Sequence, residues 1–171
     1  FKQKPAYEIL SGLVGSEMCI RDSPIYGDGQ QIRDWLFVDD HNTAIELILS
    51  SEANGETYNV GGHNEIRNLD VVKLLCVLLD TRFARDETLK LRFPHSPCAK
   101  NISAVSLIAF VHDRPGHDVR YAIDASKIKS TFNFLPSETF ATGLEKTVDW
   151  YLKNQSWWEN IQNGSYRVKS N

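Results

Sequence analysis

PIYGDGQQIRDWLFVDD, residues 24–40, joins two strand-like segments through a glycine-rich turn. A short apolar segment ends at Tyr26, the turn Gly-Asp-Gly occupies residues 27–29, and a second strand runs from about Ile32 to Val38. Asp-Gly is a strong short-range signal for a hairpin, because both turn positions tolerate positive φ at little cost. The stretch therefore predicts a β-hairpin.

The second strand carries an arginine among aromatic residues. Side chains alternate between the two faces of a strand, so Arg33, Trp35 and Phe37 share one face. A purely structural strand would more often carry Thr or Val at the first of these positions. Arg33 is therefore a candidate for binding an anion. The alternative is a surface arginine whose aliphatic stem covers an aromatic ring.

Four segments resemble the C-terminal lobe of the dTDP-glucose 4,6-dehydratases, which are members of the extended short-chain dehydrogenase/reductase family. They are YGDGQQIRDWLFVDDH (26–41), GETYNVGGHNEIRNLDVV (55–72), DRPGHDVRYAIDASKI (113–128) and ETFATGLEKTVDWYL (138–152). The resemblance runs from Pro24 to about Tyr166, and Arg-Asp-Trp followed by Arg-Pro-Gly-His-Asp is more specific than any lone glycine motif. Related sugar-nucleotide epimerases and decarboxylases share the architecture but usually lack Arg-Asp-Trp.

The resemblance implies an α/β fold, the C-terminal substrate lobe of an extended Rossmann-type short-chain dehydrogenase/reductase, in which helices accompany short strands and a β-hairpin. Residues 24–171 are expected to form this lobe, without the N-terminal NAD-binding domain of the family. Residues 1–23 match nothing in the family. We interpret the run GSEMCIRDS, which starts at Gly15, as translated sequencing-adapter read-through, against the alternative of a divergent helix.

The composition is that of an ordinary globular protein. The 171 residues suit one domain with a sizeable core, with 42% hydrophobic and 24% charged residues. A net charge of −3 argues against a nucleic-acid surface. The three cysteines cannot all pair and show no metal-ligand spacing, and no apolar run is long enough to span a bilayer. These features predict a cytoplasmic protein that binds neither nucleic acid nor membrane.

The first half of the chain predicts two helices and one strand. Asp40 is a plausible N-cap for a helix that runs to about Ser51. Residues 56–60, ETYNV, predict a short strand that could join the edge of a parallel sheet. Asn68 begins the next helix, and its side chain either caps that helix or, by resemblance, contacts the nucleotide.

The second half predicts one strand and three helices. Residues 81–103 form an insertion relative to the family, with one short helix near residues 85–92. Residues 106–111, SLIAFV, predict a buried strand. Asp124 caps a helix that ends at Asn133, a residue tolerated in the left-handed conformation. The last helix starts near Thr139 or Phe140, with an apolar stripe at helical spacing.

Residues 114–118, Arg-Pro-Gly-His-Asp, predict a stiff loop directly after the SLIAFV strand. A guanidinium matches a diphosphate with two parallel donors, and His117 can add a donor to the same oxygens or to a ribose. Either residue alone would suit a surface turn, but the family's nucleotide-binding loop has the same motif. With the resemblance, the predicted substrate-binding residues are Pro24, Ile25, Tyr26, Arg33, Asn68, Asp113, Arg114, Pro115, Gly116 and His117.

The family's reaction requires residues that this sequence does not contain. The resemblance implies oxidation of a hexose at C4 by NAD, elimination of water across C5 and C6, and return of the hydride, with a Tyr-x-x-x-Lys pair and an Asp-Glu pair as proton-transfer groups. None of the six tyrosines has a lysine four residues later, and no glycine-rich turn here leads into a helix as in a dinucleotide fingerprint. No residue is therefore predicted to be catalytic, to bind NAD or to hold a metal.

We therefore interpret the chain as a truncated dTDP-glucose 4,6-dehydratase, a lyase by family, that is inactive alone. Its expected ligand is a nucleotide diphosphate sugar, dTDP-glucose. The alternatives are a fragment of a UDP-sugar epimerase or decarboxylase, or a non-catalytic nucleotide-sugar-binding domain. The full-length family forms homodimers, mainly through the other lobe, so the fragment is expected to be monomeric or to associate non-specifically.

Overall fold

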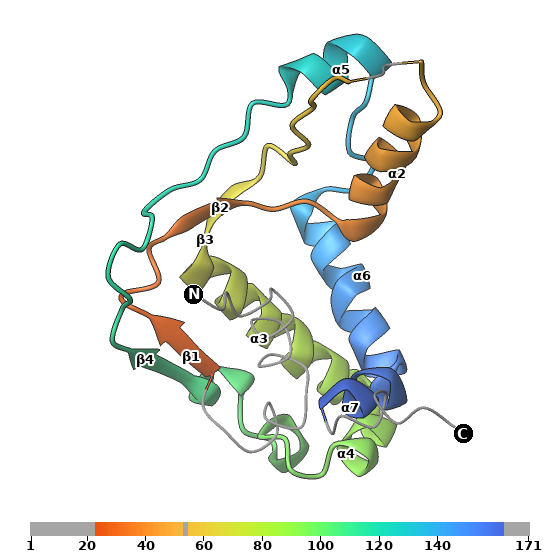
Figure 1. Cartoon of the computed structure of the whole chain (residues 1–171). Helices are drawn as coiled ribbons and strands as arrows, with labels where there is room; N and C mark the ends of the chain where they lie inside the picture. Colours follow the sequence, from red (N-terminus) through yellow and green to blue (C-terminus); the bar gives the residue numbers. More distant parts are fainter. Residues whose placement is uncertain (1–22, 53–54, 163–171) are drawn as a thin grey trace, which may run out of the picture.

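The computed structural model describes residues 23–52 and 55–162 (Figure 1). The helices are α2 (Val38–Leu49), α3 (Asn68–Arg85), α4 (Glu87–Arg92), α5 (Ser126–Phe132), α6 (Phe140–Lys153) and α7 (Gln155–Gln162), with two 3-10 turns, η1 (Cys98–Lys100) and η2 (Ala104–Leu107). The strands are β1 (Ser23–Tyr26), β2 (Ile32–Asp34), β3 (Glu65–Arg67) and β4 (Ile108–Val111). The prediction for residues 1–22 lies outside the described residues.

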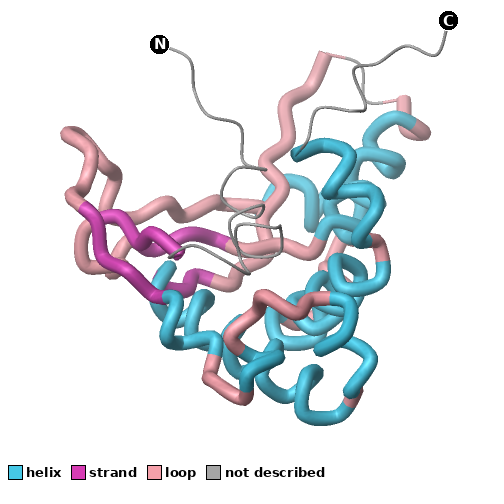
Figure 2. The backbone as a smooth tube through the Cα atoms, turned by 90° about the horizontal axis from the view of Figure 1, so that it is seen from below, coloured by secondary structure: helices cyan, strands magenta, loops and turns pink. Residues whose placement is uncertain are grey.

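Two clusters of buried apolar side chains hold the helices together. The larger cluster lies among α3, α4, α6 and α7 and includes Leu75, Phe83, Val148 and Trp158. The smaller cluster packs α2 against α5, around Ile128. Figure 2 shows the helices gathered on one side of the molecule and the short strands on the other. The strands and the loops that connect them therefore lie at the edge of the helical core.

The four strands form two pairs, each of two strands. β1 pairs in parallel with β4, so that Tyr26 lies opposite Val111. β2 pairs antiparallel with β3, so that Ile32 lies opposite Arg67, and β3 runs directly into α3. Figure 1 shows the β1–β4 pair at the end of the molecule opposite α2 and α5. This mixture of helices and short strands agrees with the predicted α/β class.

The predicted hairpin over residues 24–38 is wrong, although a strand forms on each side of the turn. Gly27 (φ +64°) and Gly29 (φ +72°) adopt the left-handed conformation and direct the chain toward the start of α3 instead of back along β1. The Gly29 carbonyl accepts the N–H of Leu69 at 3.0 Å, and the Gly27 N–H donates to the Val111 carbonyl at 2.9 Å. The turn therefore joins two strand pairs.

The predicted capping role of Asp40 is also wrong. α2 begins at Val38, and the residue before it, Phe37, makes no side-chain cap bond. The Asp40 carboxylate is buried instead, and accepts hydrogen bonds from the backbone and hydroxyl of Ser137 and from the backbone N–H of Glu138. These bonds supply the donors that a buried carboxylate needs, and they tie α2 to the segment between α5 and α6.

Three further predictions differ from the structure. Asn68 is the first residue of α3, but the cap position is Arg67 and no side chain caps this helix. Residues 56–60 are not assigned to a strand, since none of the described residues pairs with them along a sheet edge. The SLIAFV strand is shorter than predicted: η2 occupies its start, and β4 is only partly buried, with its last two residues exposed.

The other helix boundaries follow the sequence closely. The N-cap of α5 is Ala125 and not the predicted Asp124, whose carboxylate accepts the backbone N–H of Ser126 at 2.9 Å. Asn133 ends that helix at φ +52°, as predicted. Thr139 caps α6 in a capping box. α4 lies within the predicted range 85–92. No helix in the described part of the chain is long and apolar enough to cross a membrane.

Candidate nucleotide-binding site

Three segments meet beside the β1–β4 pair, and two of them, the loop after β4 and the start of α3, carry predicted binding residues. The third is the turn after β1. The backbone carbonyl of Gln31 accepts the N–H of Asn68 at 2.9 Å, which fixes the start of α3 against the residue that precedes β2. The segment after the loop returns to β2, where Ile32 exchanges backbone hydrogen bonds with Val119 and Tyr121 at 2.8 and 3.0 Å. Segments far apart in sequence are thus held together by main-chain bonds.

Asp113 organises the loop that follows β4. One carboxylate oxygen accepts from His117 Nδ1 at 2.7 Å and from the Arg114 N–H at 2.8 Å, and the other accepts from Gln31 Nε2 at 3.0 Å. Partial burial tends to raise the pKa of this carboxyl, but the bonds from His117, Arg114 and Gln31 outweigh it and lower the pKa. Asp113 is therefore an anion that accepts on both oxygens, and its contacts make the loop stiff.

Arg33 is held against the same loop. Its guanidinium donates to the carbonyl of Asp118 at 2.9 Å and to that of Ile32 at 2.7 Å, and lies 4.6 Å from the ring centre of Tyr121. A guanidinium has five N–H donors, so donors remain for a ligand after these two bonds. Arg33 does cover an aromatic ring, as the alternative of a surface arginine expects, and that ring belongs to Tyr121.

Tyr121 connects the two predicted arginines electrostatically. Its hydroxyl donates to the carboxylate of Asp118, and this hydrogen bond, together with the negative charge, raises the pKa of Tyr121. The positive charges of Arg33 and Arg114 act in the opposite direction on the same group. The two predicted arginines therefore share Tyr121 as an electrostatic neighbour.

The ten predicted residues divide by exposure. Arg114, Pro115 and Gly116 form the exposed part of the loop, while the His117 side chain is only 11% exposed. Tyr26 is exposed on β1 and Asn68 is half-buried at the start of α3. Of the remaining predicted residues, Pro24 is exposed and Ile25 is buried in the core. Arg33 and Asp113 are half-buried. The Ile25 side chain therefore supports β1 and faces away from solvent.

Sequence reasoning missed three residues that hold this site: Gln31, Asp118 and Tyr121. Asp118 is the last residue of the recognised loop motif and Tyr121 lies three residues beyond it; an aromatic residue beside Arg33 is a signal that strand pairing could have revealed. Gln31 gave a weaker signal, a polar residue immediately before an apolar strand position. Its burial follows from the turn geometry, which the hairpin interpretation did not anticipate.

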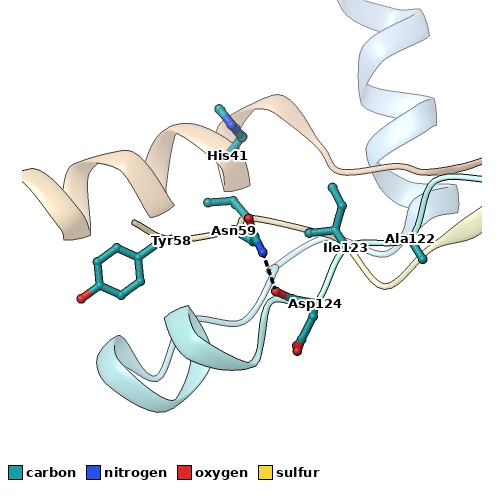
Figure 3. Close-up of a pocket in the computed structure, with 7 residues that line it drawn as sticks. His41, Tyr58, Asn59, Ala122, Ile123 and Asp124 are labelled. Atoms are coloured by element: carbon teal, nitrogen blue, oxygen red, sulfur yellow. Dashed lines mark hydrogen bonds between the residues drawn. The ribbon is translucent and has the colours of Figure 1, made fainter. Parts of the chain in front are cut away.

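A hollow lies apart from these residues, between α2 and the extended segments 58–60 and 122–124 (Figure 3). It measures about 350 Å³ and is open to solvent. Asn59 Nδ2 donates to the Asp124 carbonyl at 3.3 Å across its wall. None of the predicted binding residues lines it; the lining residues are His41, Tyr58, Asn59, Val60, Ala122, Ile123 and Asp124.

The described residues offer no alternative catalytic centre built on thiols or metals. Burial raises the pKa of Cys76 to about 11 and that of Cys98 to about 12, so both thiols stay neutral. Within residues 23–52 and 55–162, no group of three or more His, Cys, Asp or Glu side chains could hold a metal ion. The turn at Gly27 and Gly29 leads into β2 and not into a helix, so it does not fit a dinucleotide diphosphate.

The family model described as GDP-mannose 4,6 dehydratase matches residues 5–147, a range that includes most of the segment 1–23 that was expected to match nothing. The chain belongs to this family. Two relatives with the same name, dTDP-glucose 4,6-dehydratase, are similar along most of the chain. The protein from Neisseria meningitidis serogroup B is 50% identical over 161 residues, 94% of this chain and 41% of the relative. A protein from Escherichia coli is 49% identical over 158 residues, 92% of this chain and 39% of the relative.

Solved structures agree with the sequence relatives. The dTDP-glucose 4,6-dehydratase of Bacillus anthracis, in complex with NAD, is 37% identical with a TM-score of 0.65, over 91% of this chain and 40% of that one. DesIV, the dTDP-glucose 4,6-dehydratase of Streptomyces venezuelae, also solved with NAD, is 31% identical with a TM-score of 0.68, over 92% of this chain and 41% of that one. The predicted family resemblance and the fold class are thereby confirmed.

The comparisons also bear on the size of the chain and on the alternative assignment. The chain spans about 40% of the length of the relatives that it matches. A UDP-glucuronic acid 4-epimerase of Bacillus cereus has a TM-score of 0.62 but only 23% identity, so it shares the fold alone. The sequence similarity therefore favours the dehydratases over the epimerases.

Proposed function

We propose that this chain supplies the nucleotide-diphosphate-sugar-binding part of a dTDP-glucose 4,6-dehydratase, a lyase that uses NAD. The observation that carries the proposal is the contact between Arg33 and the loop at residues 113–118, in a chain 50% identical to such an enzyme. The contact sets Arg33, from β2, beside the loop that carries the exposed residue Arg114. Two guanidinium groups suit a diphosphate, because each offers parallel donors and a permanent positive charge.

The proposed ligand residues are those predicted from the sequence, with the roles adjusted to their exposure. Arg33 and Arg114 bind the diphosphate, and His117 adds a hydrogen bond to the nucleotide. Tyr26 and Asn68 contact the nucleoside from β1 and from the start of α3. NAD is assigned to no residue of this chain, because the glycine turn at residues 27–29 leads into a strand and not into a helix.

Binding of dTDP and UDP to the 171-residue chain tests the proposal. We expect calorimetry to show that dTDP binds, and binds more tightly than UDP. Tighter binding of UDP would favour the epimerase or decarboxylase alternative, and absence of binding by either nucleotide, with the protein folded, would contradict the proposed site.

A turnover assay of the 171-residue chain distinguishes a fragment that only binds the nucleotide sugar from a complete catalyst. Given dTDP-glucose and NAD, the 171-residue chain alone should yield no 4-keto-6-deoxy sugar above a blank without protein, because its sequence has no Tyr-x-x-x-Lys pair to take the hydroxyl proton. Product above the blank would show that proton-transfer groups exist which the sequence motifs do not reveal.

A further inference from the structure

Gln31 is a buried polar residue whose side chain is only half satisfied. It is 6% exposed, and its Nε2 donates to Asp113 at 3.0 Å. Its Oε1 is buried and has no hydrogen-bond partner among the described residues. A buried acceptor without a donor destabilises a fold, so such groups in native structures call for a functional explanation. An apolar side chain of the same length would fill this position without that cost.

The position of Gln31 links every segment of the candidate site. Its side chain reaches the loop after β4 through Asp113, and its backbone carbonyl accepts the N–H of Asn68 at the start of α3. The turn after β1 is fitted around the same contact. A Cβ added at Gly27 would lie 2.7 Å from the Asp113 carboxylate and 3.1 Å from Gln31 Nε2. This close approach requires glycine in the turn.

The contact between Asp113 and His117 determines which imidazole nitrogen carries the proton and which is left to contact a ligand. A carboxylate only accepts hydrogen bonds, so Nδ1, at 2.7 Å from it, must carry the proton. Nε2 of the neutral ring is then an acceptor, which suits a hydroxyl group of a nucleotide better than a phosphate oxygen. The Gln31 bond occupies the other carboxylate oxygen and so fixes the rotation of Asp113 that presents its first oxygen to the imidazole.

We propose that Gln31 is a positioning residue for nucleotide binding, which acts through Asp113 to hold His117 in the Nδ1–H tautomer and in one orientation. The inference rests on the proposed function, since the nucleotide is the ligand toward which His117 is held. Gln31 itself touches no ligand. A second consequence is that the loop and the start of α3 move together, because both are bonded to Gln31.

The variant Gln31→Met tests the proposal, because methionine keeps the length of the side chain and removes both polar ends. The matched control is Gln30→Met, at the exposed neighbouring position. We expect Gln31→Met to fold with nearly unchanged thermal stability while its affinity for dTDP falls about tenfold, a change that corresponds to about 1.4 kcal/mol. Gln30→Met should leave the affinity unchanged.

The imidazole spectrum provides a readout that a purely structural role would not change. In alkaline buffer, ¹⁵N–¹H correlation of the His117 ring should show the Nδ1–H tautomer in the wild type and a mixture in Gln31→Met. This measurement needs no nucleotide, so it also distinguishes failure of the inference from failure of the proposed function. Should Gln31→Met not fold, the variant Gln31→Asn, whose amide is one methylene shorter and no longer reaches Asp113, should show the same loss of tautomer preference. A wild-type tautomer and wild-type affinity in Gln31→Met would overturn the proposal.

Discussion

Replacing Arg33 or Arg114 with alanine should weaken dTDP binding by about ten- to hundredfold. A diphosphate between two arginines gains charge-assisted hydrogen bonds, each of which contributes about 1.5–3 kcal/mol. Loss of one guanidinium removes such a contribution, and about 1.4 kcal/mol corresponds to a factor of ten in affinity. The affinity of each variant for dTDP is measured by calorimetry, on the 171-residue chain or on a chimera with a complete N-terminal lobe of a relative.

Lysine at either position should restore only part of the affinity, because it keeps the positive charge and loses the planar fork. Arg120 offers a matched control in the same region of the surface. Its guanidinium forms an exposed ion pair with Glu65 at 2.6 Å, so Arg120→Ala should leave dTDP binding unchanged. If Arg33→Ala and Arg114→Ala are both folded and both bind dTDP as the wild type does, the nucleotide is bound elsewhere.

Sequence reasoning predicted the helices well where the signal was local. α6 is amphipathic and starts at a Thr139 capping box, and Asn133 adopts the left-handed conformation expected of it. The apolar period of α3 is also reflected in burial, since Leu75 and Leu79 lie in the larger core. Caps and apolar periodicity depend on residues a few positions apart, and sequence shows these directly.

The predicted strand pairing was wrong because the strands pair with partners that lie far away in sequence. The Asp-Gly signal describes a turn between neighbours, but Ser23 pairs with Ile108 and Asp34 pairs with Glu65. Asp34, the last residue of β2, uses its carboxylate to accept the backbone N–H groups of Gly62 and Asn64 at 2.9 and 2.7 Å. Such long-range choices are not encoded in any short window.

In the candidate site, too, the features with a local sequence signal were predicted and those that depend on long-range contacts were not. The loop at residues 113–118 and the role of Arg33 on a strand beside it followed from composition and from the family resemblance. Gln31 and Tyr121, which hold these residues in place, could not be identified from composition or from the family resemblance. Their importance arises only when the turn after β1 brings Gln31 to Asp113 and when the segment after the loop returns to β2. Contacts of this kind depend on the tertiary arrangement and become visible only in the structure.

Replacing Asp40 with alanine should lower the free energy of unfolding by about 3 kcal/mol. Its buried carboxylate accepts three hydrogen bonds from the segment between α5 and α6, at 2.8, 2.6 and 3.2 Å. Bonds to a charged group contribute about 1.5–3 kcal/mol each, and they are not additive when the donors are neighbours. For a chain of this size, the midpoint of thermal unfolding should fall by roughly 6–12 °C. The adjacent, exposed Asp39 is the matched control, and Asp39→Ala should cost less than about 1 kcal/mol.

The same carboxylate should make stability depend on pH. Burial alone would raise the pKa of Asp40, but hydrogen bonds from Ser137 and Glu138 and the charge of Lys146 lower it below the ordinary value. A folded-state pKa below the unfolded one gives stability that is fully present above the unfolded pKa and is lost as the pH falls through the folded pKa. Wild type and Asp40→Ala should therefore differ most in thermal midpoint near neutral pH, and the difference should shrink below about pH 4. A difference that stays constant from pH 7 to pH 3 would show that the Asp40 charge does not hold α2 to the segment before α6.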